Sequence, residues 1–272
     1  MERFIMKIEV MNLWNKIPGE NGDVPTITAY IPENKMHNGA VVVFAGGGYG
    51  FRSPHEGEGY AKFLAENGIC AFDVAYRVAP YEFPIELLDA RRSVKFVRHF
   101  ADKYGIDKDK IAVMGSSAGG HLAALCSTYK KDIDFEVEND EIEKEDFLPN
   151  AQILCYPVVK LSAPIGHQGS GDNLMGGKKT QELENSLTPD LIADDSAPRA
   201  FIWHTFTDEL VNVINSLGYA KKLKEAGGSV ELHIFPDGDH GMGLSQNKGT
   251  AVGDHVSQWN GLLLNWLKYI GF

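Results

Sequence analysis

The sequence is poor in features that would indicate a secreted or membrane-spanning protein. It has three cysteines in 272 residues, each inside an apolar segment and without paired or metal-like spacing: Cys70, Cys126 and Cys155. We expect them as reduced core residues. No apolar run approaches the roughly 20 residues that a membrane-spanning helix needs. Charged residues interrupt Met1–Val10, so no secretion signal is expected, and we predict a soluble, cytoplasmic protein.

Positive charge is also scarce. The chain has 26 Lys and Arg against 37 Asp and Glu, a formal net charge of -11, and no run rich in Lys or Arg. This argues against nucleic-acid binding and favours a small-molecule partner. The most acidic stretch, Asp132–Asp146, has little periodicity and is expected to be a solvated excursion.

The chain contains enough apolar residues for one large core. At 272 residues and 43% hydrophobic content, we predict a single domain that spans residues 1–272. The sequence leaves the oligomeric state open, with a homodimer as one alternative.

Strand-like and helix-like segments alternate along most of the chain, which predicts an α/β fold with a mostly parallel central sheet and helices on both faces. An antiparallel hairpin is expected at the N-terminus, around Thr26–Ile31. The clearest helical stripe lies in Pro84–Tyr104, and further helices are expected over about Glu209–Ala226 and Val252–Ile270. The predicted buried strands are Ala40–Ala45, Ile69–Tyr76, Ile111–Met114, Ala151–Tyr156, Ala200–Thr205 and Glu231–Phe235.

One segment departs from this alternation. Residues Pro157–Pro198 are rich in Gly, Ser and Asn and contain no convincing strand. They follow a predicted strand, and inserts at the carboxyl ends of such strands shape access to ligand sites. We therefore predict a small cap or lid over the site.

The most informative motif is GSSAG at Gly115–Gly119. It follows the apolar run Ile111–Met114 and precedes the helix-like run Gly120–Tyr129, which places Ser117 at the apex of a strand–turn–helix unit. Small neighbours are needed there because the strained turn brings strand and helix close together. This is the pattern of a nucleophile elbow.

A serine nucleophile needs a histidine base and an acid that orients it. Among the nine histidines, His240 lies in a polar, glycine-flanked loop just after the last predicted strand. Asp208 ends another strand, so the predicted triad runs in the order Ser117, Asp208, His240, as in α/β-hydrolases. The competing acids are Glu209, Asp237 and Asp239.

A glycine run follows the first parallel strand, at Ala45–Tyr49 (AGGGY). Its backbone N–H groups are free to face the site, so we predict that Gly47, Gly48 and Ala118 donate to the oxyanion. Candidates for the pocket lining are Tyr49, Arg52 and His55.

Other polar and aromatic residues receive structural interpretations. His121 on the elbow helix is expected to pack in the core, and so is Trp203, with sugar stacking by Trp203 or Tyr49 as the alternative. Glu56 and Glu58, together with His55, are expected to form a polar loop and a helix cap. No metal-ligand spacing is found.

The chain resembles α/β-hydrolase serine esterases, and most closely bacterial acetyl esterases described as acetylxylan esterases or sugar hydrolases. Ala45 stands where the HGGG motif of hormone-sensitive-lipase-like esterases has histidine, which is closer to the PGGGY form of the acetyl-esterase branch. The matching segments are Gly46–Gly50, Tyr76–Pro80, Gly115–Leu122, Tyr156–Pro157, Asn173–Gly176, His204–Asp208 and Asp239–Gly241.

The resemblance implies a serine carboxylesterase that hydrolyses short-chain, acetyl esters of sugars or xylo-oligosaccharides without a cofactor. Three alternatives remain open: a prolyl-oligopeptidase-like peptidase, a short-chain lipase, and a non-catalytic ligand-binding protein on a hydrolase scaffold. The completeness of the predicted triad argues against the last of these.

Overall fold

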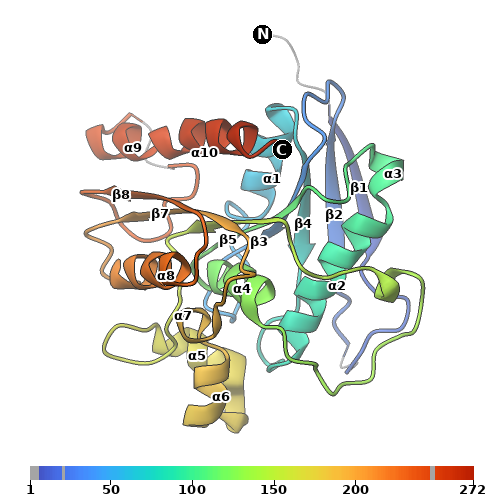
Figure 1. Cartoon of the computed structure of the whole chain (residues 1–272), viewed down its shortest axis with the longest axis horizontal. Coiled ribbons are helices and arrows are strands. Elements are labelled where there is room, and N and C mark those ends of the chain that lie inside the picture. Colours follow the sequence, from blue (N-terminus) through green and yellow to red (C-terminus); the bar gives the residue numbers. More distant parts are fainter. Residues whose placement is uncertain (1–5, 20–21, 246–248) are drawn as a thin grey trace.

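The computed structural model describes residues 6–19, 22–245 and 249–272, and eight strands in this part of the chain form one sheet (Figure 1). Their order is β1-β2-β4-β3-β5-β6-β7-β8. The strands are β1 (Met6–Asn12), β2 (Thr26–Pro32), β3 (Ala40–Phe44), β4 (Cys70–Ala75), β5 (Ile111–Ser116), β6 (Ala151–Cys155), β7 (Arg199–Thr205) and β8 (Val230–Phe235).

Strand pairing confirms the predicted topology. Strands β4, β3, β5, β6, β7 and β8 pair in parallel, whereas β1 pairs antiparallel with β2, and β2 antiparallel with β4. The N-terminal hairpin therefore extends one edge of the parallel sheet. Because the parallel strands point the same way, the loops after β3, β5, β7 and β8 gather at one edge.

Helices cover both faces of the sheet (Figure 1). Alternate side chains of β3 enter two separate cores, with Val42 in one and Val41 in the other. The helices are α1 (Glu58–Glu66), α2 (Ile85–His99), α3 (Ala101–Tyr104), α4 (Ser117–Thr128), α5 (Gln168–Met175), α6 (Gln181–Ser186), α7 (Pro189–Ile192), α8 (Ile214–Glu225), α9 (Ala251–Val256) and α10 (Gln258–Tyr269). Residues of α2, α4 and α8 belong to the core of Val42, and residues of α1 and α10 to the core of Val41.

The predicted helices are interrupted or shortened. The stripe predicted over Pro84–Tyr104 breaks at Phe100, which separates α2 from α3, and the last helix breaks at Ser257 between α9 and α10. Helix α8 starts at Ile214 rather than near Glu209, because local side-chain hydrogen bonds, described below, hold the preceding residues in turns.

Two other segments contain helices that the sequence did not predict. Helix α1 was not predicted, although Glu58 begins it. The segment Pro157–Pro198 contains no strand among its residues, as predicted, but it folds into the short helices α5, α6 and α7 and a 3₁₀ turn at Gly176–Lys178.

The acidic segment is not simply a solvated excursion. The guanidinium of Arg92 on α2 is fully buried and forms ion pairs with Glu138, Asp140 and Glu143 at 2.8, 2.6 and 3.1 Å. Three carboxylates around one buried cation compensate its desolvation. The segment is thereby attached to α2.

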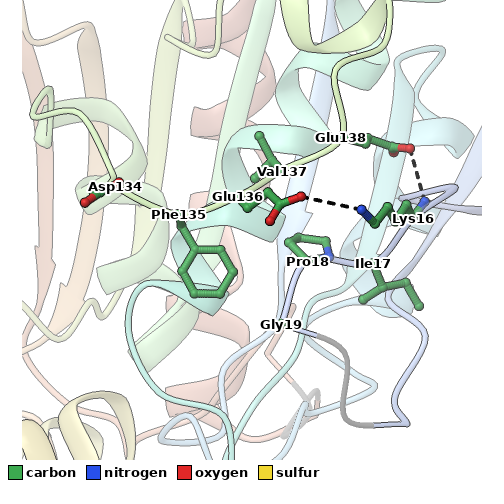
Figure 2. Close-up of a pocket in the computed structure, with 9 residues that line it drawn as sticks. All are labelled: Lys16, Ile17, Pro18, Gly19, Asp134, Phe135, Glu136, Val137 and Glu138. Carbon is green, nitrogen blue, oxygen red and sulfur yellow. Dashed lines mark hydrogen bonds and ion pairs between the residues drawn. The ribbon is translucent and has the colours of Figure 1, made fainter.

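The same segment borders a cavity of about 460 Å³ together with residues 16–19 (Figure 2). Glu138 accepts a hydrogen bond from the backbone N–H of Lys16 at 3.1 Å, and Glu136 lies 3.5 Å from the Lys16 ammonium. Its lining residues include no serine, cysteine or histidine. Among the described residues, this cavity of about 460 Å³ therefore offers no serine or cysteine nucleophile and no histidine base, although it is larger than the pocket beside Ser117.

Candidate active site

Ser117 occupies a strained turn between β5 and α4, as the GSSAG motif predicts. Its φ is 53°, a left-handed value that a non-glycine residue rarely adopts. A Cβ on Gly115 would collide with the carbonyl of Gly119, and a Cβ on Gly119 with the carbonyl of Phe44. Only glycines allow the strand and the helix to approach this closely.

The turn aims Ser117 at His240. The Ser117 hydroxyl lies 2.8 Å from His240 Nε2, and His240 Nδ1 lies 2.6 Å from Asp208 Oδ2. Since the carboxylate accepts from Nδ1–H, Nε2 is left as the acceptor that faces the serine. The structure thus brings together the three side chains that the sequence analysis selected, from the loops after β5, β7 and β8.

Asp208 receives four hydrogen bonds. Besides His240, the donors are His204 Nε2 at 3.2 Å and the N–H groups of Leu210 and Val211, both at 2.9 Å. Burial by itself would raise the pKa of Asp208, but the hydrogen bonds from the two histidines and the backbone hold it well below its usual range. The carboxylate is therefore ionised beside His240.

His204 is a partner that the sequence analysis missed. This buried side chain lies on β7, four residues before Asp208, and its Nε2 donates to the carbonyl of Val211 at 2.9 Å as well as to Asp208. Its Nδ1 accepts from the Ser216 hydroxyl at 2.8 Å. These bonds fix the turn after β7, which explains why α8 begins late.

The glycine run lies beside Ser117. Gly47 and Gly48 have φ values of 132° and 62°, and no described residue accepts a hydrogen bond from either N–H group. Ala118 lies in the first turn of α4, where N–H groups have no partner within the helix. The three predicted donors are therefore unpaired.

These groups open into a pocket of about 320 Å³. The insert contributes His167, Gly169 and Asn173 to its lining, and exposed apolar side chains, Phe51 and Leu210, lie on its wall. Asn173 Nδ2 donates to the carbonyl of Gly48 at 2.8 Å, so α5 is attached directly to the glycine run.

Two residues proposed for the pocket lie elsewhere. Tyr49 is fully buried, and its hydroxyl lies 2.7 Å from His121 Nδ1. Arg52 donates to the carbonyl of Tyr76 and lines a separate hollow. The left-handed turn at Gly48 and Tyr49 directs the tyrosine ring inward, which the sequence does not reveal. His55 does line the pocket and contacts the Gly241 carbonyl at 3.0 Å.

Glu56 was expected in a polar loop but is buried. Its two carboxyl oxygens accept from the N–H of Gly46 at 3.0 Å and from the hydroxyl of Tyr156 at 2.6 Å. The Tyr156 hydroxyl in turn accepts from Gly243 N–H at 2.9 Å, and the Tyr156 ring packs edge-on against His240 at 5.1 Å. This network links the glycine run to the loop that carries His240.

The interpretations of His121, Trp203 and the cysteines agree with the structure, whereas Glu58 does not cap α1: it is the first residue of the helix, and the cap position is Gly57. His121 is buried, which lowers its pKa to about 4, and its Nε2 lies 2.8 Å from the Leu187 carbonyl. Trp203 is buried and stacks on Trp259 at 4.8 Å. The three cysteines are buried and unpaired.

Searches for a metal site and a membrane span concern only the part of the chain that the structure describes. Within it, no group of three or more His, Cys, Asp and Glu side chains is placed to hold a metal ion. None of the described helices is both long and apolar enough to cross a bilayer.

Comparison with known proteins shows the family of this chain. The model of the BD-FAE family matches residues 27–223. The chain belongs to the BD-FAE family. A crystal structure of an acetyl ester-xyloside bifunctional hydrolase from Caldicellulosiruptor lactoaceticus is 38% identical, with a TM-score of 0.88 and 97% of each chain covered.

Two further relatives of this BD-FAE member are esterases. An acetylxylan esterase of Xylanibacter ruminicola is 33% identical over 90% of this chain, and an arylesterase of Saccharolobus solfataricus is 37% identical over 78%. The chain spans 48% of the first relative's length and 70% of the second's. With structural neighbours that are α/β hydrolases, this BD-FAE chain has the predicted α/β-hydrolase fold.

Proposed function

We propose that the chain is a serine carboxylesterase that removes acetyl groups from carbohydrate alcohols. The observation that carries the proposal is the continuous hydrogen-bonded series from Ser117 through His240 to Asp208, beside the unpaired N–H groups of Gly47 and Gly48. Nucleophile, base, orienting acid and oxyanion donors are the parts that acyl transfer requires.

In the first half-reaction, Ser117 Oγ attacks the ester carbonyl carbon while its proton passes to His240 Nε2. The oxyanion accepts hydrogen bonds from Gly47, Gly48 and Ala118, and Asp208 stabilises the imidazolium. His240 then gives the proton to the leaving alcohol oxygen as the C–O bond breaks. The acetyl group remains on Ser117.

In the second half-reaction, water replaces the alcohol. His240 takes a proton from the water as it attacks the acyl carbon, and returns it to Ser117 Oγ when the tetrahedral intermediate collapses. The balance is ester plus water giving carboxylic acid plus alcohol. No redox partner or cofactor takes part.

The substrate class rests on relatives and on pocket size. The names of two relatives refer to acetylxylan and to acetyl esters with xylosides, and those of other structural neighbours to esterases. A pocket of about 320 Å³ suits a short acyl group with part of a sugar. We also propose that Pro157–Pro198 acts as a cap, since His167 and Asn173 line this pocket.

The proposal is tested by assaying purified protein on p-nitrophenyl and acetylated-sugar esters, with Ser117→Ala as the matched inactive variant. We expect kcat to fall on the order of a millionfold in this variant, as for loss of a triad nucleophile. Comparable turnover by the variant would refute the assignment.

Chain-length dependence separates the proposal from a lipase. We expect kcat/KM to be highest for acetate and to fall toward dodecanoate, whereas an extended apolar pocket would gain up to about 0.8 kcal/mol per methylene. A maximum at eight carbons or more would assign the chain to lipases. Cleavage of prolyl peptides without ester hydrolysis would assign it to peptidases.

A further inference from the structure

His167 stands out among the pocket residues because one of its ring nitrogens has no partner. The residue precedes α5, in the insert, and lines the pocket that contains Ser117 and His240. No described residue hydrogen-bonds to His167 Nε2, whereas His55, the other pocket histidine outside the proposed triad, is engaged by the Gly241 carbonyl.

The position of the proton on His167 follows from its other nitrogen. Nδ1 lies 3.1 Å from the backbone N–H of Ser170, which can only donate, and 2.8 Å from the Ser170 hydroxyl. Nδ1 must therefore be an acceptor, and the neutral ring carries its proton on Nε2. Burial and the nearby His240 lower the pKa of His167, which favours this neutral form.

The ring also lies close to the glycine run. A Cβ added to Gly48, one of the proposed oxyanion donors, would lie 3.7 Å from His167 Cε1, the ring carbon between the two nitrogens. Asn173, at the other end of α5, lines the same pocket and uses its Nδ2 to bind the Gly48 carbonyl. Its Oδ1 has no hydrogen-bond partner among the described residues and can accept one.

We propose that His167 Nε2–H and Asn173 Oδ1 form a subsite for a hydroxyl group on the alcohol portion of the substrate, which makes His167 a specificity-determining residue. A hydroxyl both donates and accepts, so it can pair with a donor and an acceptor on residues that line the same pocket. Beyond its carbonyl, an acetyl group has only a methyl, so the alcohol portion must supply the polar partner. This inference rests on the proposed esterase function and specifies its substrate.

Two substitutions at His167 separate recognition from structure. His167→Asn keeps an acceptor for Ser170 N–H, since Asn is a favourable residue at a helix N-cap, but removes the Nε2 donor. His167→Gln places an amide donor near the position of Nε2 and weakens the cap. His255→Ala on α9, an exposed histidine outside the pocket, is the control for loss of an imidazole.

The measurement is kcat/KM on a monoacetylated xylo-oligosaccharide relative to ethyl acetate, which has no hydroxyl. We expect His167→Asn to lower this ratio about tenfold, the size of one neutral hydrogen bond of about 1.4 kcal/mol. His167→Gln should keep most of the ratio, and His255→Ala all of it. Glycerol monoacetate is the second arm: a loss confined to the xyloside identifies a sugar, and an equal loss identifies a hydroxyl-bearing alcohol in general.

An unchanged ratio in His167→Asn would overturn the proposal, and a loss in His167→Gln alone would then show that the cap is what matters. An equal loss in both variants would also overturn it, because a donor restored near the position of Nε2 would recover nothing. If the wild-type protein hydrolyses ethyl acetate while the ratio does not respond, the esterase function stands and only this subsite fails. If no ester is hydrolysed, the proposed function itself is wrong.

Discussion

Two buried carboxyl groups in different regions of this molecule have pKa values shifted in opposite directions. Asp208 follows β7 and receives four hydrogen bonds, which hold its pKa well below the usual range in spite of burial. Glu86 lies in the first turn of α2, fully buried, and no other described residue donates to either of its oxygens. Burial raises the pKa of Glu86 to about 8.

The difference teaches that hydrogen-bond donors, rather than depth, decide whether a buried acid is charged here. The positive charge of Arg77 lies near Glu86 and acts to lower its pKa. The Arg77 guanidinium, however, donates to both oxygens of Asp89, at 2.9 and 2.7 Å, and to neither oxygen of Glu86. Glu86 therefore stays protonated through neutral pH. Asp208 can orient a histidine because it is ionised, and Glu86 cannot serve that purpose.

The largest expected effect comes from removing the negative charge of Asp208, the acid that receives four hydrogen bonds. Asp208→Asn should lower kcat about 10⁴-fold, because an amide favours the wrong tautomer of His240. Steady-state kinetics on p-nitrophenyl acetate, with circular dichroism to check folding, would measure it. Glu209→Gln, at the exposed neighbouring residue, should retain wild-type kcat. Near-normal turnover in Asp208→Asn would require another acid.

Tyr156→Phe would remove one of the two hydrogen-bond donors to a third buried side chain, that of Glu56. It removes the hydroxyl that donates to Glu56 and accepts from Gly243, which leaves two buried polar groups without that partner. We expect a loss of about 1–3 kcal/mol in the free energy of unfolding. The loop of His240 should also become less ordered, so that kcat/KM falls roughly tenfold, the equivalent of about 1.4 kcal/mol.

Urea unfolding and steady-state kinetics would test Tyr156→Phe, with the exposed Tyr269→Phe as the matched control. Wild-type values for both stability and kcat/KM in Tyr156→Phe would show that the Glu56 network positions nothing.

Glu86→Gln tests whether the buried carboxyl group of Glu86, to which no other described residue donates a hydrogen bond, makes the stability of the fold depend on pH. Between pH 4.5 and about 8 the folded state keeps a proton that the unfolded chain releases, so the free energy of unfolding falls as pH rises. Glutamine is neutral at every pH, so Glu86→Gln should abolish this decrease in the free energy of unfolding, which is at most about 1.4 kcal/mol per pH unit. Asp208 acts in the opposite direction, because its stabilising effect is lost only as pH falls below its ordinary value of 3.8.

Urea unfolding of wild type and Glu86→Gln at several pH values between 5 and 8 would measure the slope. Parallel curves for the two proteins would mean that Glu86 is ionised in the folded state after all.

The smallest effect is expected at a surface acid that also has strong donors. Glu9 pairs with Lys103 at 2.8 Å, and hydrogen bonds from Lys103 and Lys7 lower its pKa to about 2. Water screens these contacts, so Glu9→Gln should cost about 0.5 kcal/mol or less, and less still in high salt. A loss above about 2 kcal/mol by thermal unfolding would contradict this view of exposed pairs.

Much of the fold and the centre of the candidate site could be predicted from the sequence. The six parallel strands, the hairpin, and the placement of Ser117, Asp208 and His240 at strand ends all agree with the structure. The prediction that β8 is buried was wrong: it is only partly buried, because it forms the edge of the sheet. These signals are local: an apolar run, a turn with required glycines, and a polar residue just after a strand. Physical constraints within a few residues leave few alternatives there.

Only the tertiary structure decided which side chains surround that centre. Glu56 and Tyr156 are 100 residues apart in sequence and meet in the core, and the contact of Asn173 with Gly48 spans 125 residues. His204 resembles any strand residue until the turn after β7 brings Asp208 back onto it. Tyr49 looked like a pocket residue until its left-handed backbone directed it inward. Local sequence determined the strands and the residues of the proposed triad because turn strain and periodicity act over short range. The burial of a side chain and the number of hydrogen-bond donors around it depend instead on packing between distant segments.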